Sequence, residues 1–89
     1  MRLESTARFL RDYERLPENV QVRLDQTLER LLANPRHPSL QFKKMQGYPD
    51  RWEGRVSRSY RITFSISGSI SGDVYRLRRG GPHDILESP

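Results

Sequence analysis

Apolar and polar side chains alternate with two different periods along this chain of 89 residues. Up to about residue 33 the apolar positions recur every three or four residues, as they do on one face of an amphipathic helix. From residue 52 onwards they recur every second residue, which is typical of strands that bury one face. The pattern therefore predicts helices first and strands second.

The first helix is predicted over residues 5–16 and the second over residues 18–33. Pro17 separates them and suits the first turn of the second helix, which Asn34 and Pro35 end. Two antiparallel helices joined by a short turn follow from this spacing. Their buried stripes are expected to be Phe9, Leu10, Tyr13 and Leu16, and Val20, Leu24, Thr27, Leu28, Leu31 and Leu32.

Three strands follow, each with one apolar face that packs on the helices and one face that carries arginine. The apolar positions are Trp52, Gly54 and Val56, then Tyr60, Ile62, Phe64 and Ile66, then Tyr75 and Leu77 in a strand over about residues 73–78. A tandem Ser-Ile-Ser-Gly repeat over residues 65–72 predicts a lengthened, flexible hairpin tip, or else an extension of both strands. After the third strand Gly80 and Gly81 are expected to turn the chain, and residues 83–87 to form one helical turn.

The composition limits the size and setting of the protein. With 89 residues and no cysteine, we expect a single domain over residues 1–89, held together by its core and not by a disulfide framework. No apolar run approaches the ~20 residues of a membrane span, and no signal peptide is visible. We therefore expect a small soluble, cytoplasmic protein with no membrane partner.

The net charge of +5 lies entirely in the C-terminal part of the chain. Residues 1–34 hold six basic and six acidic side chains, whereas residues 35–89 hold ten basic and five acidic ones. Fourteen of the 16 basic residues are arginine, whose planar guanidinium suits bidentate contacts with phosphate. This distribution favours a nucleic acid or another phosphate-bearing partner. A basic half that only keeps the protein in solution is the alternative.

Four arginines are expected on neighbouring strands of one sheet face, namely Arg55, Arg61, Arg76 and Arg78. Such a face repels itself unless it binds an anion, and a concave arginine surface suits an RNA backbone. Lys43 and Lys44 add charge from the loop that leads into the sheet. The alternative is a solvated face that Glu53 and Asp73 relieve, beside an ordinary exposed lysine pair.

His83 is the proton-transfer group expected beside this face. One catalytic interpretation is metal-free RNA cleavage. A base helps the 2′-hydroxyl attack the adjacent phosphate, arginines stabilise the charged phosphorane, and an acid protonates the leaving 5′-oxygen. Neither a metal-ligand cluster nor a Gly-rich phosphate loop is visible, so no metal and no cofactor are expected. His37 is expected to be a loop residue, and a structural role is the alternative for His83.

Five segments carry a resemblance to a known family. They are residues 31–40 (LLANPRHPSL), 43–47 (KKMQG), 52–56 (WEGRV), 60–62 (YRI) and 81–86 (GPHDIL). In their order and spacing they resemble the RelE/ParE superfamily of bacterial toxin–antitoxin toxins, over nearly the whole chain. The resemblance implies an α+β fold, with an N-terminal helical hairpin packed on a small, curved antiparallel sheet and a short C-terminal helical turn.

The RelE-like branch of this superfamily cleaves messenger RNA, usually in the ribosomal A site, and a cognate antitoxin neutralises it. The resemblance implies that Arg61 stabilises the transition-state phosphate and that Lys43 and Lys44 bind the RNA backbone. It also implies a basic residue at the end of the last strand, which is Arg78 or Arg79. The expected activity is that of an mRNA endoribonuclease, and the expected partners are mRNA, the ribosome and an antitoxin.

In YafQ- and YoeB-like members a C-terminal histidine acts in proton transfer, and His83 matches it. The catalytic tyrosine of RelE itself is missing after Ile85, so His83 carries more of the hypothesis. The chain also departs from the family in a short edge strand, at about residues 2–4, and in the longer last hairpin. Two other functions stay open: a ParE-like inhibitor of DNA gyrase, and a toxin-fold remnant that only binds an antitoxin.

Overall fold

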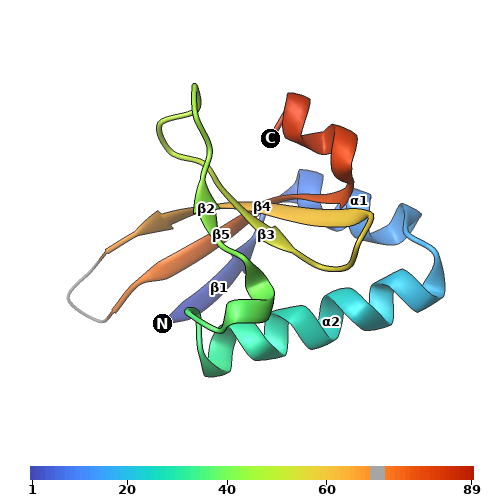
Figure 1. Ribbon diagram of the computed structural model, residues 1–89, viewed down its shortest axis with the longest axis horizontal. Coiled ribbons are helices and arrows are strands. Elements are labelled where there is room, and N and C mark those ends of the chain that lie inside the picture. The colour runs from blue at the N-terminus through green and yellow to red at the C-terminus, as the bar shows by residue number, and fades with distance from the viewer. Residues whose placement is uncertain (69–71) are drawn as a thin grey trace.

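The computed structural model describes residues 1–68 and 72–89 and has an α+β architecture (Figure 1). Its helices and strands are β1 (Arg2–Ser5), α1 (Ala7–Arg15), α2 (Glu18–Ala33), β2 (Lys43–Lys44), β3 (Trp52–Arg55), β4 (Tyr60–Ser67) and β5 (Val74–Pro82). Two short 3₁₀ helices are η1 (Pro38–Leu40) and η2 (His83–Glu87). The expected α+β class and the C-terminal helical turn are confirmed. The helices precede four of the five strands, whereas the edge strand β1 comes before them.

The five strands form one sheet in the order β1-β5-β4-β3-β2. The sheet is mixed, so the expectation of a purely antiparallel sheet is wrong. β1 pairs with β5 in parallel, with Leu3 opposite Tyr75, whereas the other neighbouring strands are antiparallel. Parallel strands need a long connection, and here two helices and three strands lie between β1 and β5. The alternation of apolar residues is the same in both arrangements, so it does not predict strand direction.

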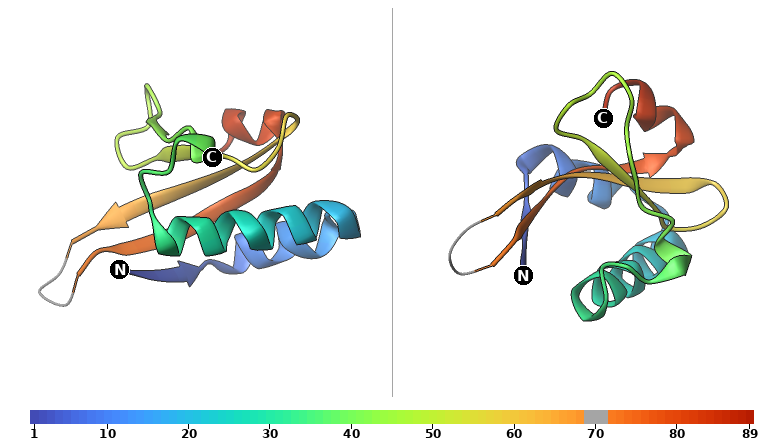
Figure 2. Two further views of the ribbon diagram at one scale, coloured as in Figure 1. Left: turned by 60° about the horizontal axis from the view of Figure 1, so that its bottom comes forward. Right: turned by 60° about the vertical axis from the view of Figure 1, so that its left-hand side comes forward.

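α2 lies against one face of the sheet, while η2 and the loop of residues 45–51 lie over the other face (Figure 2). The core forms on the α2 side, where the best-buried side chains are Phe9, Leu24, Leu31, Leu40, Ile62, Phe64 and Leu77. The apolar strand positions predicted from the alternation therefore do face the helices. The charged side chains of the same strands lie on the opposite face.

The two helices begin and end close to where the sequence predicts. The Oγ1 of Thr6 accepts a hydrogen bond from the backbone N–H of Phe9 at 3.1 Å and caps α1. Two members of the expected buried stripes are wrong, because Leu10 and Leu32 are 52% and 51% exposed. Each follows a buried residue and so lies about 100° further round its helix, outside the stripe that meets the sheet.

β5 continues past Arg78 to Pro82, so the expectation that Gly80 and Gly81 turn the chain is wrong. Both glycines lie where another element comes close to the strand. A Cβ on Gly80 would lie 3.1 Å from the Phe9 ring, and one on Gly81 would lie 2.9 Å from a methyl group of Ile85. The missing side chains thus let α1 and η2 pack on β5.

Two further expectations concern the hairpin between β4 and β5 and the absence of a membrane span. β4 ends at Ser67 and β5 begins at Val74. The expectations for the tip of the tandem repeat fall on residues 69–71, which lie outside the described residues. No helix in the described part of the chain is long and apolar enough to cross a membrane.

Candidate nucleic-acid interface

A cavity of about 300 Å³ lies at the edge of the sheet, between β3, β4, η2 and the segment that enters β2. We call it the arginine cavity. Its lining residues are Gln41, Phe42, Lys43, Glu53, Gly54, Arg55, Arg61 and His83. Four of them were predicted from the sequence to bind or cleave RNA: Lys43, Arg55, Arg61 and His83. The fold therefore brings half of the predicted site residues around one cavity.

Strand pairing explains how residues so far apart in the chain meet. Arg55 on β3 lies directly opposite Arg61 on β4, so the two side chains leave the same face of the sheet. Lys43 lies opposite Glu53, two positions before Arg55 on that same face. Because the first residue of β4 pairs with the last residue of β5, His83 follows at the same corner of the sheet.

The guanidinium of Arg61 is held in place by the turn between β3 and β4. Its Nη1 donates to the backbone carbonyl oxygens of Ser57 at 2.7 Å, Tyr60 at 2.9 Å and Arg58 at 3.3 Å. Within the described residues no carboxylate pairs with Arg61, and its Nε and Nη2 make no hydrogen bond. One edge of the guanidinium is therefore anchored, and the other can receive an anion.

Glu53 is a cavity residue that the sequence analysis did not place in the site. Its side chain is only 10% exposed, and its carboxylate lies 3.1 Å from Nζ of Lys43, whose side chain is 73% exposed. The alternation puts Glu53 on the same face as Arg55, which is the signal that could have found it. The two-residue strand β2, which pairs with β3 beside Glu53, could not be predicted from any pattern in the sequence. Glu53 holds Lys43 at the wall of the cavity and lowers the net positive charge there.

The two histidines have different surroundings. His83 begins η2, its side chain is exposed, and it makes no hydrogen bond or ion pair with the described residues. Both ring nitrogens of His83 are thus accessible for proton transfer. In His37, by contrast, Nδ1 accepts a hydrogen bond from the backbone N–H of Ser39 at 3.2 Å and caps η1. His37 thus lies in the loop before η1, as expected.

The other four predicted site residues, Lys44, Arg76, Arg78 and Arg79, do not line the arginine cavity. Lys44 lies opposite Trp52 and lines a separate hollow with residues 45–49. Arg76 pairs with Glu4 of β1, with 3.2 Å between Nη2 and Oε1. Arg79 pairs with Asp12 of α1, with 2.6 Å between Nε and Oδ2, and both side chains are largely buried. The guanidinium groups of Arg76 and Arg79 thus each have a carboxylate partner within the protein.

Arg78 differs from its neighbour Arg79. The register between β4 and β5 shifts after Thr63, so that Arg78 is an extra residue of β5 in a bulge. Its Nε is buried and has no hydrogen-bond partner among the described residues. Burial lowers the pKa of the Arg78 guanidinium, and the positive charges of Arg51 and Arg76 lower it further. Both effects disfavour the charged form of this side chain, the charge of Asp50 opposes them, and a bound anion would oppose them further.

The residues around the arginine cavity define what chemistry it can support. Guanidinium and ammonium groups bind an anion and stabilise negative charge that develops on it, while an accessible imidazole transfers protons near neutral pH. Among residues 1–68 and 72–89, no three His, Cys, Asp or Glu side chains form a group that could hold a metal ion. The arrangement suits acid–base chemistry on a phosphate ester.

Comparison with known proteins gives no match to a family model or to a curated protein sequence. Solved structures do match. A YoeB/ParE toxin from Agrobacterium tumefaciens has a TM-score of 0.75 at 20% identity, over 93% of this chain and 99% of that one. YafQ from E. coli strain BL21(DE3) has a TM-score of 0.75 at 15% identity, over 94% of both chains.

A chain of the RelB–RelE antitoxin–toxin complex from Methanococcus jannaschii is also similar. Its TM-score is 0.66 at 19% identity, over 94% of both chains. The three structures are a YoeB/ParE toxin, YafQ and a chain of a RelB–RelE complex. This chain therefore has the fold of the RelE/ParE-like toxins, as the sequence resemblance implies.

Proposed function

We propose that this chain is the toxin of a bacterial type II toxin–antitoxin system and cleaves messenger RNA on the ribosome, in the cytoplasm and without a metal ion. The observation that supports the proposal most is the arginine cavity. It gathers Lys43, Arg55, Arg61 and His83, which come from distant parts of the sequence. A fold likeness alone would not require these four side chains to converge.

In the proposed reaction the 2′-oxygen attacks the adjacent phosphorus, loses its proton to a base, and displaces the 5′-oxygen, which receives a proton. Arg61 stabilises the charge on the phosphorane through the edge of its guanidinium that the β3–β4 turn leaves unbonded. His83 transfers protons, while Lys43 and Arg55 hold the flanking backbone. Arg78 is the better candidate for the basic residue of β5, because Arg79 is paired with Asp12.

An antitoxin is the proposed protein partner. The similar RelE chain from M. jannaschii was solved as an antitoxin–toxin complex with RelB. A positively charged cavity that binds RNA is also expected to attract an acidic segment of an inhibitor protein. Expression of this chain without its antitoxin should then arrest bacterial growth.

The test is primer extension on a defined mRNA, with and without ribosomes, using the wild type, His83→Ala and Arg61→Gln. We expect each substitution to slow cleavage by about a hundredfold or more, because each removes one group that acts in the transition state. Arg58→Gln is the matched control for Arg61, since Arg58 is an exposed arginine of the adjoining turn. Asp84→Ala is the control for His83, since it changes the next residue of η2.

Undiminished cleavage by both site variants would overturn the assignment of residues. Uncut mRNA together with inhibition of gyrase supercoiling would select the ParE-like alternative instead. A chain that arrests no growth, cuts no RNA and still binds an antitoxin would be the remnant that the sequence analysis left open. Cleavage that persists without ribosomes would keep the nuclease and remove only the ribosome from the proposal.

A further inference from the structure

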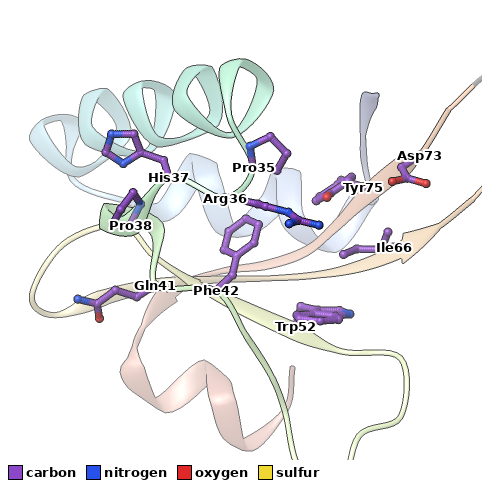
Figure 3. A pocket seen from close by; sticks show the side chains of 10 residues that line it. All are labelled: Pro35, Arg36, His37, Pro38, Gln41, Phe42, Trp52, Ile66, Asp73 and Tyr75. Atoms are coloured by element: carbon purple, nitrogen blue, oxygen red, sulfur yellow. The ribbon is translucent and has the colours of Figure 1, made fainter.

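A second cavity, of about 620 Å³, lies on the apolar side of the sheet, next to the segment that follows α2 (Figure 3). We call it the aromatic cavity. The residues that line it include Arg36, Gln41, Phe42, Trp52, Asp73 and Tyr75. Its volume is in the range of ~300–1,000 Å³ that small-molecule sites occupy. None of these residues belongs to the proposed catalytic set.

Aromatic rings form much of the wall of this cavity. Two of these rings pack against the buried ring of Phe64, whose centroid lies 4.7 Å from that of Phe42 and 5.6 Å from that of Tyr75. Trp52, the single tryptophan of the chain, is half-buried on the neighbouring strand β3. Rings fixed in this way offer flat apolar surfaces on which a planar group can stack.

Two charged side chains, those of Arg36 and Asp73, also line this cavity. Figure 3 shows the Arg36 side chain reaching into the cavity towards Tyr75, with Asp73 beyond that ring. Burial raises the pKa of the Tyr75 hydroxyl, the charge of Asp73 raises it further, and the charge of Arg36 opposes both. The guanidinium of Arg36 makes no hydrogen bond or ion pair with the described residues. A donor and an acceptor are thus available beside the stacking surfaces.

The aromatic cavity and the arginine cavity share two lining residues, Gln41 and Phe42. This segment runs along the edge of β3, where Gln41 Oε1 accepts a long hydrogen bond of 3.5 Å from Arg55 and Phe42 lies against Gly54. Gln41 has a φ of 47°, in the left-handed region that non-glycine residues rarely adopt. An RNA strand that leaves the arginine cavity over this edge would enter the aromatic cavity.

We propose that the aromatic cavity binds an unstacked base of the RNA whose phosphate lies in the arginine cavity. The proposal rests on the proposed function and adds to it a subsite for the nucleotide next to the cleaved bond. The base stacks on the rings of Trp52 and Phe42, and its edge meets Arg36 and Asp73. Single-stranded RNA is recognised in this way, by aromatic stacking combined with hydrogen bonds to base edges.

The polar groups favour a base over an apolar side chain of a partner protein. An apolar anchor would bury Arg36 and Asp73 and leave their donors and acceptor without partners, which costs free energy. A nucleobase has both a flat face for the rings and an edge with donors and acceptors. The net charge of +5 and the cations of the adjoining cavity also favour the polyanionic strand.

The test uses Trp52 fluorescence with a short 2′-O-methyl oligoribonucleotide, which has no free 2′-hydroxyl and cannot be cleaved by the proposed route. A second oligonucleotide of equal length and charge lacks its bases. We expect only the base-containing strand to change the Trp52 emission, and to bind about tenfold more tightly, because stacking contributes that much per base. Equal binding and equal emission for both strands would overturn the subsite.

Arg36→Gln should reduce this preference for bases, whereas Arg15→Gln should leave it unchanged. Each variant loses one exposed arginine charge, but Arg15 ends α1 and lines neither cavity. A synthetic acidic, apolar peptide that alters Trp52 emission when neither oligonucleotide does would overturn the proposal. Cleavage of mRNA without base-dependent binding overturns the subsite alone. Base-dependent binding by a protein that leaves mRNA uncut overturns the proposed function alone.

Discussion

The arginines at the two ends of the charged sheet face differ in whether they form an ion pair within the protein. At the end near η2, Arg55 and Arg61 form no ion pair within the described residues, and they border a cavity. At the other end Arg76 meets Glu4 of the edge strand β1. The difference teaches that arginine on an exposed face is not by itself evidence of a binding site. Among the arginines of this face, those without an internal carboxylate partner are the better candidates to receive a ligand.

The same contrast occurs between two consecutive residues of β5. Arg79 is bound to Asp12 with 2.6 Å between Nε and Oδ2, whereas Arg78 has a buried Nε with no partner in the described part of the chain. The bulge between β4 and β5 gives the two side chains different surroundings. We therefore expect Arg79 to act on stability and Arg78 to act on RNA.

Replacing Arg79 with Gln should have the largest effect of the changes that test this contrast. The substitution leaves the Asp12 carboxylate, which is only 11% exposed, with the backbone N–H of Gly80 but no cation. Removing one partner of a buried ion pair costs about 3 kcal/mol or more. Urea unfolding should show this loss of unfolding free energy, with cleavage per folded molecule little changed.

The double variant Asp12→Asn with Arg79→Gln is the control for that measurement. It removes the stranded charge and should recover part of the lost stability. Arg79→Gln at wild-type stability but without RNA cleavage would contradict the division of roles between Arg78 and Arg79.

Arg78→Met should lower cleavage by about tenfold to a hundredfold, as expected when one cation that stabilises the charge developing on the phosphate is lost. Methionine keeps a long apolar side chain, and it removes a buried Nε that has no partner among the described residues. Leaving such a donor unsatisfied costs about 1–3 kcal/mol, so the unfolding free energy should rise by about 1 kcal/mol. Arg78→Lys, which keeps the charge, should retain more of the cleavage than Arg78→Met. Less stable protein with full activity would contradict this prediction.

These pairings also show how far the sequence could predict the site. Alternation along the strands placed Arg55 and Arg61 on one face, and the positions of Lys43 and His83 in the chain were enough to nominate them. The partners of Arg76 and Arg79 lie 72 and 67 positions away in the sequence. No periodic pattern reports such contacts, because they depend on how β1 and α1 pack beside β5.

The fold was predictable to a similar degree. The periods of the apolar residues predicted both helices and the strands β3, β4 and β5, since burial of one face determines them. The two glycines of β5 were misread as a turn, because a glycine needed for close packing looks the same in a sequence as one needed for a turn. The bulge at Arg78 and the parallel pairing of β1 depend on neighbouring strands and leave no local signal.

Glu53→Gln tests how a carboxylate limits RNA binding at the arginine cavity. Glu53 is the carboxylate that pairs with Lys43 at the cavity wall. Its neutralisation releases a cation and raises the local charge, so we expect about fivefold tighter RNA binding and a salt dependence steeper by about 0.7 in the logarithmic slope. Binding of a 2′-O-methyl oligonucleotide at several salt concentrations measures both effects. Glu29→Gln, on the exposed face of α2, makes the same charge change elsewhere. Equal gains in both variants would show a general charge effect and not a local one.

Arg76→Gln is expected to have the smallest effect. Its partner Glu4 is 39% exposed and Arg76 itself is 50% exposed, so their ion pair is a surface pair. Such pairs contribute about 0–1 kcal/mol, and the unfolding free energy should fall by no more than that. Loss of a cation already paired with Glu4 should change RNA cleavage by less than about twofold, because the nearby carboxylate cancels much of its field. A large loss of cleavage in Arg76→Gln, at unchanged stability, would mean that RNA displaces Glu4 and uses the whole arginine face.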